Sequence, residues 1–123
     1  MSSKNKIIKS FSFAFSGIKE ALKNEPNLKI HFFLALLAIV LAYLLKLPMI
    51  EWAILILTIG LVLTLELINT SLEAIVNLVS PEIKEGAKIA KDVAAASVLI
   101  SAAVALLIGA FLFLPKILSL LVS

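Results

Sequence analysis

Four polar residues recur at helical spacing directly after a long apolar run. The segment ELINTSLEAIVN, Glu66 to Asn77, follows Trp52 to Leu65, which carries no charge. Carboxylates bind Mg²⁺ through oxygen, and a carboxylate can also take the proton of an attacking hydroxyl. At about 100° per residue, the polar members lie within an arc of about 80° on one helical face: Glu66, Asn69, Glu73 and Asn77.

This polar face cannot look into lipid, because a mid-membrane acid costs about 2.5–3.5 kcal/mol even on lenient scales. Counting from Trp52 at about 1.5 Å per residue, Glu66 lies roughly 21 Å and Glu73 roughly 31 Å along the helix. Both acids therefore fall near one end of a span, facing a protein interior or a wet cleft. The structural alternative is that these polar groups hold helices together in an oligomer.

The loop that follows adds charges at the same end. In SPEIKEGAKIAKDVAA, lysines can neutralise phosphates together with a metal, and acids can complete a phosphoryl-transfer site. Asp92 opens the third apolar stretch, so its alternative role is a helix cap. The chain has no Gly-rich P-loop, which excludes that kind of phosphate cradle. The charged residues of the loop are Glu82, Lys84, Lys88, Lys91 and Asp92.

The elements that must position these groups are membrane helices. The 123 residues are 62% hydrophobic, against about 45–50% in an average soluble domain. We therefore expect one all-α membrane domain over residues 1–123. A span needs roughly 17–25 residues, and Pro81 is a sensible stop for the second. The expected spans cover about 28–47, 51–80 and 92–115.

The N-terminal segment, about 4–25, is predicted to be an amphipathic helix on the membrane surface. The alternative is a helix packed on the bundle, and Phe13 falls outside the apolar wedge in either case. Its apolar face is formed by Ile7, Phe11, Ile18 and Leu22, and its lysines lie opposite.

Lysines orient the spans. Six lysines precede the first span and three lie between the second and third, whereas only Lys46 and Lys116 fall on the other side. This excess places the N-terminus in the cytoplasm and the C-terminus outside. The net charge of +3 suits phosphates or an anionic leaflet, and no nucleic-acid-binding motif accompanies it. The chain has no cysteine, so cysteine chemistry is excluded.

Two further residues precede the polar face. Glu25 lies at the junction of the surface helix and the first span. Taken alone, its side chain would be interpreted as a solvated charge. His31 is interpreted as an interfacial packing residue, and we assign it no role. A non-enzymatic membrane subunit or channel with pore-lining glutamates is the competing function. A pore needs polar residues along the whole span, whereas here they gather at one end.

ELINTSLEAIVN resembles the signature of the small bacterial integral-membrane lipid kinases, the diacylglycerol kinase and undecaprenol kinase family. AKIAKDVAAASVLIS and FSGIKEALKNEPNLKIH resemble two further blocks of that family. The resemblance implies a homotrimer of three-span protomers with a surface helix in the bacterial cell membrane. It also implies ATP with Mg²⁺ as phosphate donor and a membrane lipid as acceptor.

The same resemblance implies roles for individual residues. Glu66 takes the general-base position with Asn69 as its polar partner, and Glu25 and Glu73 take the Mg²⁺-binding positions. Three protomers would let neighbouring chains share a site, with Glu25 reaching Glu73 across a boundary. The ATP-binding set is Lys6, Phe13, Glu25, Glu73, Glu82, Lys84, Lys91 and Asp92.

The chain departs from the family pattern at two places. Asn77 stands where the signature has Asp, so an acidic role there is lost while hydrogen bonding can survive. The segment AAAS, 94–97, lacks a glycine that many members carry. KNEPNLKIH looks more like the undecaprenol kinase branch, so we expect undecaprenol rather than diacylglycerol as the acceptor.

Overall fold

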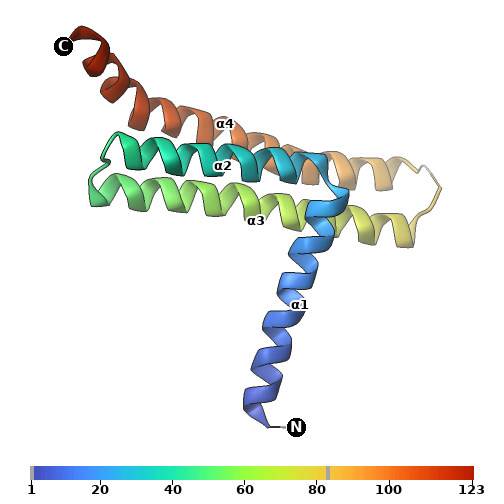
Figure 1. Ribbon diagram of the computed structural model, residues 1–123. Helices are drawn as coiled ribbons and strands as arrows, with labels where there is room; N and C mark the ends of the chain where they lie inside the picture. The colour runs from blue at the N-terminus through green and yellow to red at the C-terminus, as the bar shows by residue number, and fades with distance from the viewer. Residues whose placement is uncertain (1, 83) are drawn as a thin grey trace.

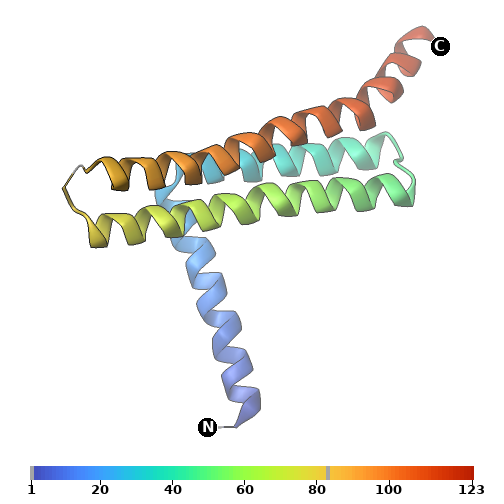
Figure 2. The same ribbon diagram turned by 180° about the vertical axis from the view of Figure 1, so that it is seen from behind.

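The computed structural model describes residues 2–82 and 84–123, all of whose regular structure is helical. Three long helices run side by side, and the first helix leaves them crosswise (Figures 1 and 2). The predicted all-α fold with three helices long and apolar enough to span a membrane is confirmed. The helices are α1 (Ser3–Asn24), α2 (Pro26–Leu44), α3 (Met49–Val79) and α4 (Glu85–Val122).

The change of direction between α1 and α2 occurs at Glu25. Pro26 occupies the first turn of α2, where its missing N–H is not needed. A residue before proline is driven out of the helical region, and Glu25 accordingly has φ −111° and ψ 104°. Its backbone N–H still bonds to Ala21 O at 2.8 Å, which closes α1. One residue therefore ends one helix and precedes the next.

The turn between α2 and α3 is closed by a Schellman motif. Leu47 N–H donates to Ala42 O at 3.1 Å, and Lys46 N–H donates to Tyr43 O at 3.2 Å. Lys46 has a φ of 54°, a conformation usually taken by glycine at this position. Leu47 and Ala42 are both buried in the main apolar cluster, as this motif favours. Pro48 then precedes α3.

The main apolar cluster lies at the α2–α3 turn, where α4 passes over it. It is formed by Ala42, Leu47, Leu55 and Leu112, with Trp52 packed against them. Beside it, Lys116 of α4 pairs with Glu51 of α3 and also donates to Leu112 O at 3.1 Å.

α4 continues past Pro115 to Val122, and its last turns diverge from α2 and α3 (Figure 1). Proline removes one helical hydrogen bond and crowds the preceding turn, so the divergence has a local cause. Lys116, which follows Pro115, then holds this part of α4 to α3 through Glu51.

Large apolar side chains cover most of the outside of the bundle, as lipid contact requires. α1 is different, because its N-terminal half projects away from the other helices (Figure 1). Ile7 and Phe11 on its apolar face are exposed in the single chain. Near its C-terminal end α1 does contact the bundle, and Ala21 is buried there, so the placement of α1 on the membrane surface stays a prediction.

Candidate functional site

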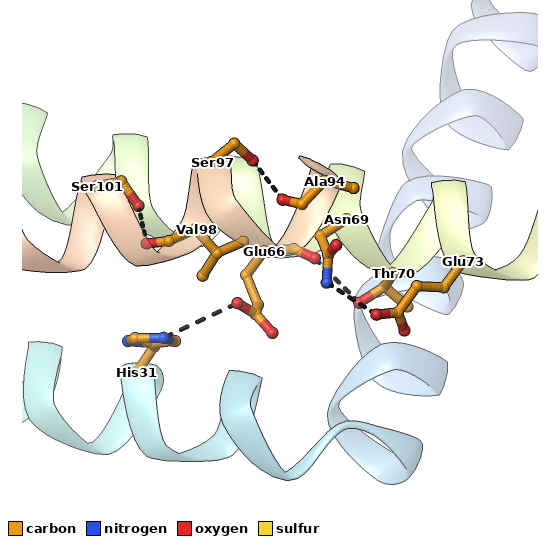
Figure 3. Close-up of polar contacts among 9 residues, drawn as sticks. All are labelled: His31, Glu66, Asn69, Thr70, Glu73, Ala94, Ser97, Val98 and Ser101. Atoms are coloured by element: carbon orange, nitrogen blue, oxygen red, sulfur yellow. Dashed lines mark hydrogen bonds and ion pairs between the residues drawn. The ribbon is translucent and has the colours of Figure 1, made fainter. Parts of the chain in front are cut away.

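The most deeply buried charged group of the described residues is Glu66, in the C-terminal half of α3, which is 1% exposed. His31 of α2 faces it, with Nε2 of the imidazole 3.8 Å from Oε2 of the carboxylate (Figure 3). α4 covers the same level with the small residues Ala94 and Ser101, both buried. Burying a carboxylate at the meeting of three helices is costly, so Glu66 is a candidate functional residue.

Asn69 lies one turn beyond Glu66 and is also buried. Its Nδ2 donates to Oε1 of Glu73 at 3.3 Å, which is the i,i+4 relationship expected on a helix. Thr70 Oγ1 donates to the backbone oxygen of Glu66 at 3.0 Å (Figure 3). The polar face predicted from the sequence thus connects a buried acid to a half-buried one.

A cleft of about 720 Å³ separates α1 from the C-terminal half of α3. Glu25, Glu73 and Asn77 line it, so one chain brings both expected metal ligands to one cleft. A contact between Glu25 of one chain and Glu73 of a neighbouring chain is therefore not required to bring the two acids to one cleft. Within the described chain, the Glu25 side chain makes no capping hydrogen bond to α2, which leaves its carboxylate free for a ligand.

The donor set of this cleft suits Mg²⁺. No three His, Asp or Glu side chains of residues 2–82 and 84–123 gather closely enough to enclose a metal ion. Mg²⁺ does not need such a cage, because it is usually held by one or two carboxylates, water and substrate phosphates. Glu25 and Glu73 supply two carboxylates to the same cleft. The residues present therefore fit the ion.

A second cleft, of about 180 Å³, lies between the end of α3 and the start of α4. Asn77 lines both clefts, so the two lie near each other at this residue. Its lining includes the predicted nucleotide-contacting residues Glu82, Lys84, Lys91 and Asp92.

Asp92 is not a helix cap, because α4 begins at Glu85 with Lys84 as its N-cap. Asp92 instead accepts a hydrogen bond from Lys88 Nζ at 2.6 Å. Lys88 also lines this cleft, and the sequence-based site omitted it. Its spacing of four residues from Asp92 was the available signal.

Two predicted ATP-binding residues lie apart from these clefts. Lys6 and Phe13 belong to α1, and the described linings of the two clefts include neither. Phe13 is 72% exposed. The other predicted ATP-binding residues each line one of the two clefts of the single chain, whereas Lys6 and Phe13 line neither.

His31 is the residue of the site that sequence reasoning missed. A lone histidine in an apolar stretch is usually a packing residue, and its contact with Glu66 depends on how α2 and α3 align. The available signal was its position. His31 lies near the start of α2, and the C-terminal half of the antiparallel α3, which carries the acids, lies at the same level.

Comparison with known proteins decides the family. The model of the family described as prokaryotic diacylglycerol kinase matches residues 12–113. The chain belongs to this family. Similar members include a diacylglycerol kinase of Synechocystis, 44% identical over 117 residues that cover 94% of this chain and 67% of that protein. The undecaprenol kinase of Bacillus subtilis is 39% identical over 92% of both chains. A diacylglycerol kinase of Escherichia coli is 33% identical over 83% of this chain and 84% of its own length.

The resemblance inferred from ELINTSLEAIVN is thus confirmed, and so is the prediction of an enzyme. This member of the prokaryotic diacylglycerol kinase family is a membrane lipid kinase. Membership implies phosphoryl transfer from ATP to a lipid. The alternative of a non-enzymatic channel is therefore set aside.

Proposed function

We propose that this kinase transfers the γ-phosphate of ATP to the hydroxyl of undecaprenol at the cytoplasmic side of the membrane. The observation that carries the kinase chemistry is the arrangement of one buried acid, Glu66, beside a cleft with two more, Glu25 and Glu73. Support for undecaprenol comes from the Bacillus subtilis undecaprenol kinase, which matches over 92% of both chains.

In the proposed reaction, the acceptor hydroxyl attacks the γ-phosphorus and its proton passes to the Glu66 carboxylate. The new O–P bond forms as the bond to the leaving ADP oxygen breaks, and ADP keeps that electron pair. Glu25 and Glu73 would hold Mg²⁺, which when bound neutralises phosphate charge. Lys84, Lys88 and Lys91 at the second cleft supply further positive charge to the nucleotide.

The acceptor is tested with purified enzyme in mixed micelles, supplied with ATP and either undecaprenol or diacylglycerol at equal mole fraction. We expect a higher kcat/KM for undecaprenol. A higher value for diacylglycerol, the acceptor named for the Synechocystis relative, would overturn the acceptor while leaving the kinase intact. Glu66→Gln enzyme serves as the blank for each lipid.

The proposed setting is a homotrimer with α1 in the cytoplasmic headgroup region. Exposed Ile7 and Phe11 support contact of α1 with acyl chains. The excess of lysines on one side supports a cytoplasmic N-terminus. Because the chain has no cysteine, Ser3→Cys and Ser123→Cys give single labels. An impermeant maleimide added to intact cells should modify only Ser123→Cys, and cross-linking in membranes should yield trimers.

A further inference from the structure

The acid proposed as the general base has one oxygen without a partner. Oε2 of Glu66 is buried and, among the described residues, accepts no hydrogen bond. Leaving a buried acceptor unsatisfied costs about 1–3 kcal/mol, and more when it is charged. The site as drawn in Figure 3 therefore calls for a donor to this oxygen.

Two neighbouring polar side chains on α3 donate to other acceptors. Asn69 Nδ2 donates to Glu73, and the Thr70 hydroxyl donates to the backbone oxygen of Glu66. His31 Nε2 lies 3.8 Å from Oε2, which is beyond hydrogen-bond length but within reach of a small movement. Catalytic hydrogen bonds are often long in ligand-free enzymes and tighten in the complex.

His31 lies between the buried carboxylate of Glu66 and an apolar groove. Its side chain is 19% exposed, against 2% for Glu66. It lies on the border of an apolar groove of about 560 Å³ between α2, α3 and α4, lined partly by Ala35, Ala105 and Gly109. The imidazole thus lies at the boundary between this apolar groove and the buried carboxylate of Glu66.

We propose that His31 is a positioning residue for Glu66. Its Nε2–H donates to Oε2 and fixes the orientation of the carboxylate, which leaves Oε1 to accept the proton of the lipid hydroxyl. A carboxylate held by a donor at one oxygen samples fewer orientations, so its other oxygen points more consistently. This role rests on the proposed function and adds a residue to that site.

The kinetic test compares two variants of His31. His31→Phe keeps an aromatic ring and removes the donor, whereas His31→Gln keeps a donor amide. We expect His31→Phe to lower kcat at least about tenfold with the KM for Mg²⁺-ATP nearly unchanged, and His31→Gln to recover most of the rate. Equal losses in both variants, accompanied by equal loss of thermal stability, would show a packing role and overturn the proposal.

A second measurement needs no turnover, because His31 is the one histidine of the chain. The ¹⁵N spectrum of histidine-labelled protein in micelles therefore reports His31 alone. Glu66→Gln should shift the Nε2 resonance, whereas Glu51→Gln, the same change at the other end of α3, should leave it in place. A resonance unmoved by Glu66→Gln would contradict the contact.

The wild-type rate separates the two possible failures. Wild-type enzyme inactive toward both undecaprenol and diacylglycerol would contradict the proposed function and the positioning role that depends on it. Active wild type with an equally active His31→Phe would contradict the positioning role alone.

Discussion

Glu25 and Glu73 line one cleft of a single chain, although they lie far apart in the sequence. Glu25 is placed there by the α1–α2 junction, and Glu73 by two turns of α3 beyond Glu66. Their side chains are both half-buried, which leaves each carboxylate partly open to a ligand. The pairing makes the metal-binding proposal testable one residue at a time.

Replacing the two proposed metal ligands should weaken Mg²⁺-ATP binding. Glu25→Ala and Glu73→Ala should each lower the affinity, and the double variant should lose little more, because either change breaks the same site. Isothermal titration of ATP with Mg²⁺ measures this. Glu85→Ala, an exposed acid in the first turn of α4, is the control. Small, additive losses would mean that the two residues do not share an ion.

Mixing chains tests whether the two ligands act within one protomer. Glu25→Ala chains reassembled with Glu73→Ala chains should stay inactive, since the structure brings both acids to one cleft of the same chain. The measurement is lipid phosphorylation by mixed oligomers verified by cross-linking. Recovery of activity would show that each site draws Glu25 and Glu73 from different chains.

Removing the proposed base should abolish turnover without emptying the nucleotide site. Glu66→Gln is nearly isosteric, so the buried position should still pack, while the proton acceptor is lost. We expect kcat to fall by about 10²–10⁴-fold and the affinity for Mg²⁺-ATP to change little. Glu51→Gln on the same helix should keep a near-normal rate. A Glu66→Gln enzyme of near wild-type kcat would remove this residue from the mechanism.

The turn between α2 and α3 predicts a stabilising substitution. Lys46 holds a φ of 54°, a region where a Cβ costs about 1–2 kcal/mol and glycine has no such penalty. Lys46→Gly should therefore raise the midpoint of thermal unfolding in detergent. Lys46→Ala removes the same charge but keeps the Cβ, so it should give no comparable gain. Equal midpoints for the two variants would argue against strain at this residue.

The sequence could predict the all-α architecture and the polar face, because both follow from periodicity within one segment. Glu66, Asn69 and Glu73 share a face by arithmetic alone, and Pro26 marks the place where α1 must end. The contact between His31 and Glu66 could not be predicted, since it depends on the rotation and alignment of α2 against α3. These are set by packing that no single segment encodes.

The helices extend beyond the expected membrane spans for a physical reason. Hydropathy favoured a third span beginning near Asp92, but α4 begins at Glu85, and the polar turns before Asp92 are helical too. Polarity sets where a helix leaves lipid, not where it starts. α4 also continues through Pro115, because proline can be tolerated within membrane helices.

The three long helices have unequal lengths, and the shortest is the one that carries His31. α2 has 19 residues, or about 28 Å, close to the roughly 30 Å hydrocarbon thickness of a bilayer. α3 and α4, with 31 and 38 residues, reach about 46 and 57 Å and must extend into the headgroups or water.

Hydrophobic mismatch therefore acts chiefly through α2, which has no spare length and is joined at Pro26 to the crosswise α1. His31 lies five residues after Pro26, or about 8 Å along the helix, so it keeps a fixed depth below the end of α2. Thinning or thickening of the bilayer shifts that end relative to the headgroups. We therefore expect the level at which Glu66, the proposed base, meets the acceptor hydroxyl to depend on membrane thickness.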